Sequence, residues 1–268
     1  MAKASQSNYK LTFCIANSTN FTDFLKKFIV VDTNALLELK TDNTIGIKSF
    51  TASRTAVKMG SLRLEDIFDF DSSQTIEKNI KIGIYFVETF IKMINIVSEE
   101  TNDAYLDIFY ESDADGEFSA RSIDVYNNSL KYNFICAQKN LFKYMSDDIV
   151  KTVFNTDNNK FEFELDTVNL KKIELITSVE KGTNIEIKLV GDQDDYELFF
   201  ITKNSKWKCH SEVTVNEPDS SIVINKEHLK YIDKEKYKVF VNDSKIVLES
   251  QDSDSFVTFG ANATNDDE

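Results

Sequence analysis

The spacing of apolar residues between Asn20 and Val31 predicts an amphipathic helix. The apolar positions recur at i, i+3, i+4, i+7 and i+8, the spacing of one helical face: Phe21, Phe24, Leu25, Phe28 and Ile29. Asp23, Lys26 and Lys27 fall on the opposite face. The first turn has three candidate capping residues: Ser18, Thr19 and Asn20. One side of this helix therefore requires a hydrophobic core, and the other presents lysines outward.

Apolar–polar alternation, broken by short polar turns, predicts β-strands over most of the remaining chain. In the first half they are Tyr9–Ala16, Ala35–Lys40, Thr44–Phe50, Thr55–Arg63, Asn79–Tyr85, Ala104–Tyr110, Phe118–Val125 and Ser129–Ala137. In the second half they are Phe161–Leu165, Ile185–Val190, Tyr196–Thr202, Lys206–Val213, Ser221–Asn225, Tyr237–Val241, Lys245–Glu249 and Ser255–Phe259. Further helices are expected at Val87–Val97, Thr167–Val179 and Lys226–Lys234.

The helix at Thr167–Val179 has an imperfect pattern. Leu170, Ile173 and Ile176 form a stripe. Three other apolar residues lie away from it: Val168, Leu175 and Val179. Either this helix is buried on two sides, or part of the assignment is wrong.

The order of these elements repeats along the chain, which indicates a duplicated domain. Leu25-Lys26-Lys27 returns as Leu170-Lys171-Lys172, and Ile91-Lys92-Met93-Ile94 returns as Leu229-Lys230-Tyr231-Ile232. Residues 138–160 interrupt the repeated order of strands and helices. Apolar and polar residues are mixed there, which predicts a connector that lies against a surface. We therefore expect domains at 1–137 and 161–268, the second ending in an acidic tail, with 138–160 joining them.

Composition supports a globular chain and narrows its function. The 268 residues are 41% hydrophobic and 12% aromatic, enough for a substantial core. The net charge of −14 argues against a protein that grips nucleic acid over its whole surface, although a local basic face remains compatible with it. With seven glycines and one proline, glycine-built phosphate loops are scarce, and neither GxGxxG nor GxxxxGK[ST] occurs.

The sequence lacks a recognisable catalytic or metal-binding set, so we expect neither an enzyme nor a cofactor. Cys14, Cys136 and Cys209 form no CxxC motif and suggest reduced thiols in a cytoplasmic protein. His210 beside Cys209 lacks two further zinc ligands at a suitable spacing. The acidic segment Glu111–Glu117 lacks the EF-hand order and is better explained as a hairpin turn. No signal peptide or membrane-spanning run is apparent.

The strand-into-helix segments resemble those of DNA sliding clamps, especially the two-domain clamps of T-even-type phages and proliferating cell nuclear antigen. The segment Ile80–Phe86 followed by Phe90–Ile94 is similar to the clamp element in which an alternating strand with a glycine leads into a short lysine-bearing helix. Ile222–Asn225, Leu229-Lys230 and Tyr237–Val239 are similar to the corresponding element of the second domain. The resemblance extends over roughly Tyr9–Phe259.

This resemblance implies an α+β sliding-clamp fold with two similar domains, each with antiparallel β sheets outside and two helices on the inner face. It implies a homotrimeric ring around double-stranded DNA, bound without sequence specificity, with a DNA polymerase and a clamp loader as partners. A phage protein would act in the cytoplasm of the infected host cell. The lysines expected to face DNA are Lys26, Lys27, Lys92, Lys171, Lys172 and Lys230.

The resemblance also suggests where subunits and partner peptides bind. Exposed sheet edges at Ser119–Tyr126 and Lys206–His210 would join neighbouring subunits. The expected interface residues are Ser119, Arg121, Ile123, Val125, Lys206, Trp207 and Lys208. Trp207 could instead stack a base or simply pack. The expected peptide pocket comprises Leu141, Phe142, Tyr144, Met145, Phe256 and Phe259, although the four connector residues could equally be plain core.

Two other functions fit the same sequence. One is a monomeric clamp-fold processivity factor that holds DNA by charge without encircling it. The other is a non-enzymatic structural or virion protein whose repeat is purely architectural. The oligomeric state separates the ring from the monomer, and stimulation of a polymerase separates both from the structural protein.

Overall fold

A computed structural model describes residues 9–69, 75–100, 103–113, 116–142, 145–192 and 195–261. The chain divides into two compact units, residues 1–49 with 59–144 and residues 50–58 with 145–268. Residues 50–58 thus belong to the second unit although they precede most of the first. The expected boundaries at 137 and 161 stay a prediction. Tyr144 and the acidic tail lie outside the described residues.

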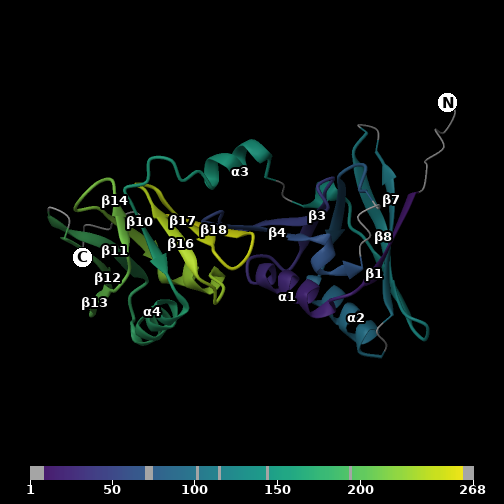
Figure 1. Ribbon diagram of the computed structural model, residues 1–268, viewed down its shortest axis with the longest axis horizontal. Helices are drawn as coiled ribbons and strands as arrows, with labels where there is room; N and C mark the ends of the chain where they lie inside the picture. Colours follow the sequence, from purple (N-terminus) through teal and green to yellow (C-terminus); the bar gives the residue numbers. More distant parts are fainter. Residues whose placement is uncertain are drawn as a thin grey trace. The chain divides into compact units, whose positions relative to one another are not determined.

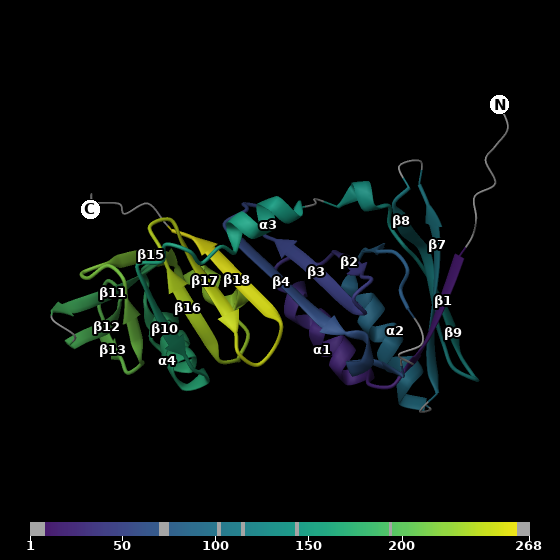
Figure 2. The same cartoon turned by 45° about the horizontal axis from the view of Figure 1, so that its top comes forward.

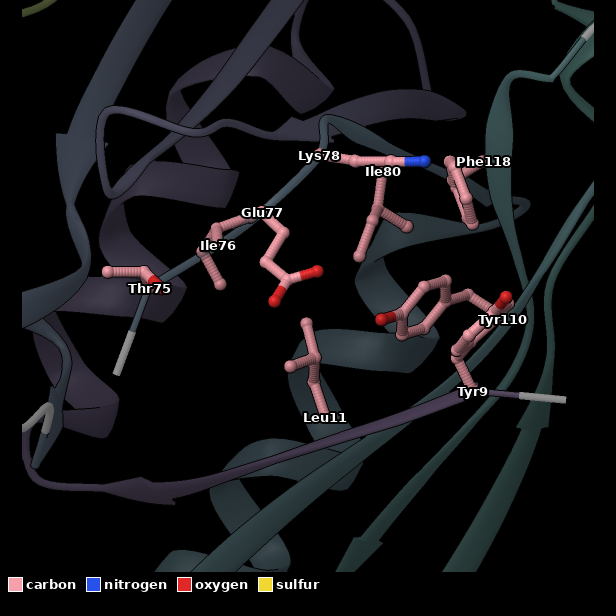
Figure 3. Close-up of a pocket in the computed structure, with 9 residues that line it drawn as sticks. All are labelled: Tyr9, Leu11, Thr75, Ile76, Glu77, Lys78, Ile80, Tyr110 and Phe118. Carbon is pink, nitrogen blue, oxygen red and sulfur yellow. The ribbon is translucent and has the colours of Figure 1, made fainter. Parts of the chain in front are cut away.

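The first unit is built on a sheet with strand order β4-β3-β2-β6-β8-β7-β1-β5, and β9 pairs with β8 (Figure 1). The strands are β1 (Tyr9–Ile15), β2 (Ala35–Leu39), β3 (Thr44–Phe50), β4 (Ala56–Arg63), β5 (Phe68–Asp69), β6 (Ile80–Ile84), β7 (Ala104–Ser112), β8 (Phe118–Tyr126) and β9 (Lys131–Ile135). A short 3-10 helix, η1 (Leu64–Asp66), precedes β5. A cavity opens where β1, β7 and β8 meet the segment that enters β6 (Figure 3).

Two helices of the first unit, α1 (Ser18–Ile29) and α2 (Val87–Glu100), lie side by side (Figure 2). The predicted stripe of α1 is buried except at Ile29, which is half-buried, and Phe21 and Phe28 are at most 2% exposed. Phe21 meets Phe90 of α2 edge to face, with ring centroids 6.4 Å apart. The cap differs from the expectation: Asn17 precedes the helix, and its side chain accepts a hydrogen bond from the Asn20 backbone N–H at 2.9 Å.

The second unit contains two sheets, with strand orders β14-β10-β16-β17-β18 and β13-β12-β11-β15. The strands are β10 (Phe161–Leu165), β11 (Asn184–Asp192), β12 (Asp195–Ile201), β13 (Lys206–Cys209), β14 (Val213–Val215), β15 (Ser221–Asn225), β16 (Tyr237–Val241), β17 (Lys245–Ser250) and β18 (Ser255–Gly260). The helices are α4 (Thr167–Val179) and the 3-10 helix η3 (Lys226–Tyr231). Residues of the connector form η2 (Lys139–Leu141) in the first unit and α3 (Asp147–Val153) in the second.

The two units repeat the same element order and the same strand pairing. β1 pairs with β5 and β7, as β10 pairs with β14 and β16. β2 lies between β3 and β6, as β11 lies between β12 and β15. Successive hairpins β7-β8-β9 and β16-β17-β18 end both units. The duplication inferred from short sequence repeats is thus present at the level of topology.

The predicted α+β class is confirmed, with three local differences. β6 and β8 make a short parallel contact, Ile80 with Phe118 and Lys81 with Ser119, inside an otherwise antiparallel arrangement. The single strand expected at Lys206–Val213 is two strands, because β13 pairs with β12 whereas β14 pairs with β10. The helix expected at Lys226–Lys234 is a 3-10 helix that ends at Tyr231.

The uncertain helix is present with the predicted bounds, and only one side of it is buried. Leu170 and Ile173 enter the core of the second unit. Its off-stripe apolar residues are highly exposed: Val168 (69%), Leu175 (69%) and Val179 (79%). The weak amphipathicity of α4 therefore reflects apolar residues on its solvent side rather than a helix buried twice.

Two ionisable side chains are buried in the second unit. The Lys58 ammonium is fully buried and pairs with the Asp233 carboxylate at 2.7 Å. His228, 6% exposed, stacks on Phe259 with ring centroids 5.0 Å apart, and its Nε2 lies 3.3 Å from the Thr55 hydroxyl. Burial lowers the pKa of His228, helped by the Lys230 charge and opposed by Glu227.

We expect His228 to make stability depend on pH. Because its pKa is lowered in the folded chain, the unfolded chain binds the proton first as pH falls below the ordinary value of 6.5. The stabilisation is therefore present above that pH and is lost below it. The free energy of unfolding, measured by urea titration between about pH 7.5 and pH 5.5, should fall more steeply for the native chain than for H228Q. The control is H210Q, because His210 is exposed. If the free energy of unfolding changed as little with pH in H210Q as in H228Q, the pH dependence could not be assigned to His228.

Candidate functional site

In the first unit, the three lysines expected to face DNA lie on the exposed sides of α1 and α2. The side chains of Lys26 and Lys92 are 54% and 67% exposed. Lys27 is partly exposed beside the buried α1 stripe. Lys26 pairs with Asp23 at 2.8 Å and Lys92 with Glu88 at 3.0 Å, both on their own helix. Exposed pairs of this kind hold a lysine weakly, so a phosphate can compete for it.

In the second unit, the remaining three lysines lie on α4 and η3. Lys171 and Lys172 are exposed on α4, and the Lys172 ammonium lies over the Trp207 ring, 4.5 Å from its centroid. Lys230 on η3 pairs with Glu227 at 3.4 Å. Its pKa is raised, chiefly by Tyr231, so it stays charged. A hollow of about 350 Å³ is lined by both helical elements: Glu174, Thr177, Ser178, Lys226, Glu227, Leu229 and Lys230.

The structure therefore places the predicted lysines of each unit on its helical elements, on the sides away from the cores. Lys226 was missed by the sequence analysis because it opens η3 outside the repeated Leu-Lys motif. It lines the same hollow as Lys230, although its ammonium donates to the Glu180 carbonyl at 2.6 Å. Acidic residues pair with Lys26, Lys92 and Lys230 and moderate the charge of the surface, which favours weak, exchangeable contacts with a polyanion.

The expected subunit edge at Ser119–Tyr126 is wrong. β8 pairs with β7 on one side and β9 on the other, so its backbone groups are already used. Ile123 and Val125 are at most 1% exposed because they point into the core. Ser119 is half-buried and Arg121 exposed on this interior strand. The edge beyond β8 is β9, where Ile135 is 71% exposed.

The second expected edge is present. β13 ends its sheet, pairing with β12 through Lys206–Cys209. Lys206 and Lys208 are exposed, and Lys208 pairs with Glu197. Trp207 is half-buried and stacks on Phe200 at 5.3 Å, so its ring packs within the unit rather than standing free for a base.

The residues expected to line a peptide pocket have different surroundings in their own units. In the first unit, Leu141 is 60% exposed and Phe142 stacks on Tyr85, with centroids 5.3 Å apart. In the second unit Met145 is half-buried, and the half-buried Phe256 meets Phe154 edge to face at 6.0 Å. Phe259 is fully buried, so a pocket wall at that position is wrong. Tyr144 lies outside the described residues.

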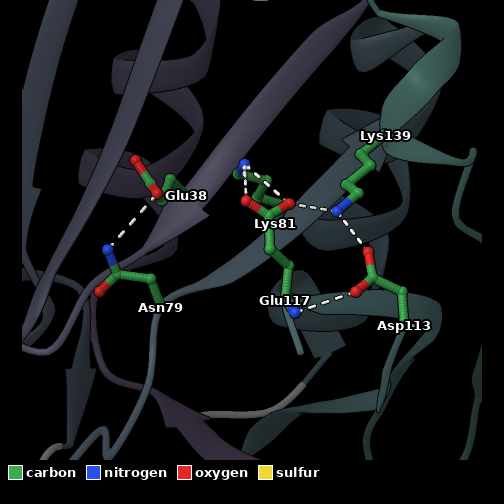
Figure 4. A network of polar contacts seen from close by, with 6 residues as sticks. All are labelled: Glu38, Asn79, Lys81, Asp113, Glu117 and Lys139. Atoms are coloured by element: carbon green, nitrogen blue, oxygen red, sulfur yellow. Dashed lines mark hydrogen bonds and ion pairs between the residues drawn. The ribbon is translucent and has the colours of Figure 1, made fainter. Parts of the chain in front are cut away.

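A polar network holds the start of the connector to the first unit (Figure 4). The Lys139 ammonium donates to the carboxylates of Asp113 and Glu117 at the β7–β8 turn, and Lys81 of β6 donates to Glu117 at 3.3 Å. These bonds lower the pKa of Glu117 and raise that of Lys139, so both stay charged at neutral pH.

Gly83 brings the connector against β6. Its backbone carbonyl accepts from the Ala137 N–H at 2.9 Å. A Cβ at this position would lie 2.3 Å from the Ala137 oxygen and 2.6 Å from the Phe142 ring. The glycine in the predicted Ile80–Phe86 segment thus has a steric role that alternation alone did not reveal.

The described residues offer little support for catalysis. No group of three or more His, Cys, Asp or Glu residues among them is arranged to hold a metal ion. Burial raises the pKa values of Cys136 and Cys209 to about 12, which leaves those thiols protonated and unreactive. No helix in the described ranges is long and apolar enough to cross a membrane.

Comparison with solved structures identifies the fold. A chain of the PCNA2–PCNA3 complex from Sulfolobus tokodaii matches with a TM-score of 0.61 and 13% identity, over 94% of this chain and 100% of that one. Proliferating cellular nuclear antigen from Entamoeba histolytica gives 0.62 and 12%, over 93% and 97%. The Helicobacter pylori beta clamp bound to a DNA ligase peptide gives 0.63 and 12%, over 96% and 68%.

The chain therefore has the sliding-clamp fold over nearly its whole length. No protein-family model matches it, and a search of curated proteins also found no match. At this low identity the likeness establishes the fold, and the function has to be argued from the site.

We expect G83A to displace the start of the connector, because the added methyl group meets backbone rather than a movable side-chain end. The substitution should destabilise the first unit by about 1–3 kcal/mol. Amide hydrogen exchange at residues 138–142 should quicken. The control is G46A, whose methyl group would meet the flexible Lys40 side chain at 3.1 Å. Equal protection at 138–142 in both variants would show that Gly83 does not set the connector.

Proposed function

We propose that this chain is a DNA sliding clamp, a non-enzymatic ring that encircles duplex DNA and tethers a polymerase for processive synthesis. The observation that carries the proposal is the repeated unit of the clamp fold, in which each unit presents exposed lysines on the outer sides of its helices. Lysine contacts to phosphate carry no sequence information, as a sliding protein requires.

The strand edges support a closed ring of identical subunits. In the second unit, Gly260 at the end of β18 donates to the Thr55 carbonyl at 3.0 Å, and the first residues of β4 follow β18 in the sheet. By element order, β18 corresponds to β9 and β4 corresponds to β13. The same two kinds of edge, β9 and β13, remain at the ends of their sheets. Pairing β9 of one subunit with β13 of the next would repeat the order of β18 and β4 in the sheet, head to tail.

The partner peptide of a polymerase or clamp loader would bind beside the connector. Leu141 supplies an exposed apolar side chain on the part of the connector that belongs to the first unit. Such side chains suit the apolar anchors of a short peptide.

Assembly is tested by the substitution I135D. A charge at this exposed edge residue should weaken ring formation by at least about tenfold, because it would be buried without a partner. Light scattering after size exclusion should give a native mass near three times the 30.7 kDa chain and a much smaller mass for the variant. The matched control V168D places the same change at a residue of similar exposure in the first turn of α4, where an acid is tolerated.

A native chain that stays monomeric at micromolar concentration would contradict the ring. If V168D dissociated the assembly as readily as I135D, the result would contradict the assignment of the β9 edge as a subunit interface.

DNA contact is tested by the triple reversal K26E/K92E/K171E. It should reduce loading onto primed DNA and the length of polymerase products by about tenfold or more at low salt, with a smaller defect at higher salt, because each lost phosphate contact removes counterion release and makes binding less salt-dependent. Folding and ring mass should persist, since exposed lysines contribute little to stability.

The control reverses three exposed lysines that lie outside α1, α2, α4 and η3: Lys151, Lys203 and Lys234. A control triple that impaired synthesis equally would mean that total charge, and not the helix faces, governs DNA binding.

A further inference from the structure

The cavity at the end of the first unit is walled by aromatic rings. Its volume is about 320 Å³, and it is lined by Tyr9, Leu11, Thr75, Ile76, Glu77, Lys78, Ile80, Tyr110 and Phe118. Tyr9 and Tyr110 are paired across β1 and β7, with rings stacked at 5.3 Å. Phe118 of β8 stands edge-on to both rings, at 5.7 Å and 5.9 Å. Three rings from three strands thus form one continuous aromatic wall.

A carboxylate faces this wall. Figure 3 shows Glu77 and the Tyr110 hydroxyl pointing toward one another across the cavity. The pKa of Tyr110 is raised, first by burial and then by the Glu77 charge, in agreement with that arrangement. Among the residues that the structure describes, no basic side chain forms an ion pair with Glu77.

The wall already holds one cation from its own chain. The Lys78 ammonium lies over the Phe118 ring, 4.7 Å from the centroid. Lys78 is exposed and joined by a flexible stem, so it can move aside or share the wall. The Tyr110 ring, stacked on Tyr9, lies along the same lining, and its hydroxyl points toward Glu77 (Figure 3).

We propose that this cavity is a docking site for an arginine side chain of a basic partner protein. A planar guanidinium stacks on tyrosine rings and donates to a carboxylate and to a phenolic oxygen at once, which an ammonium does less well. The volume suits one long side chain with its stem against Leu11 and Ile80. The net charge of −14 draws a basic partner toward the chain. This site goes beyond the proposed clamp function and needs neither DNA nor a ring.

The test uses three capped tripeptides, acetyl-Gly-Xaa-Gly-amide, with arginine, lysine or norleucine in the centre. The full-length protein carries ring-labelled tyrosine, and binding is followed by NMR shifts of Tyr9 and Tyr110. The arginine peptide should shift both rings saturably, and norleucine should bind at least about fivefold more weakly, since it lacks the cation. Lysine should fall between them.

Variants of the protein then test the contribution of the Glu77 charge to peptide binding. E77Q should weaken the arginine peptide by at least about fivefold, because it removes a charge-assisted bond, and K78Q should tighten it. The matched control is E99Q, an exposed carboxylate on α2 that does not line the cavity. Glu77 is itself exposed, so E77Q should fold normally, and unchanged unfolding by urea checks this.

Three results would overturn the proposal. Norleucine binding as tightly as arginine would make the cavity an apolar site. Arginine binding that E77Q leaves unchanged would deny the role of the carboxylate. Shifts absent from both tyrosine rings at saturating peptide would place any binding elsewhere. A failed ring or DNA assay would leave this site unaffected, because its measurement uses the chain alone.

Discussion

The packing of a helix stripe against a sheet is the constraint on which the rest of each unit depends. In the first unit, the buried phenylalanines of α1 meet those of α2 and the sheet, as the contact of Phe21 with Phe90 and that with Phe68 show. In the second unit, Leu170 and Ile173 of α4 and Leu229 of η3 enter one core. Burial of these side chains is the main favourable term in folding. It also fixes which side of every helix remains for lysines.

Backbone pairing is the second constraint, and it determines where another subunit could attach. A strand flanked on both sides, such as β8, has no free hydrogen-bonding edge, whatever its side chains are. The two units have equivalent strand edges, and within the second unit Gly260 at the end of β18 donates to the Thr55 carbonyl that precedes β4. β9 and β13 remain at the ends of their sheets, and the proposed head-to-tail ring would use both of them.

Positive and negative charges are distributed unevenly over the chain. The chain is strongly acidic, yet its exposed helix sides carry lysines, and Lys26, Lys92 and Lys230 each pair with a carboxylate of the same helix or of η3. Under the proposed function, such a surface would attract a polyanion without holding it at one place. Identity of 12–13% to clamps of known structure shows how little the fold depends on particular residues, provided that the apolar pattern and the strand order are kept.

The sequence by itself determined the elements whose patterns are local. The α1 stripe, the bounds of α4 and the strands Thr44–Phe50 and Ser221–Asn225 followed from periodicity, because burial of one face imposes it directly. The exposure of the helix lysines followed from the same pattern, because they occupy the positions opposite the apolar stripe. Only the tertiary structure decided that Asn17 caps α1, that β9 covers β8 and that Phe259 is core. It also brought Tyr9, Tyr110 and Phe118 together around Glu77. These features depend on which distant strands pair, and pairing partners leave no periodic trace in the sequence.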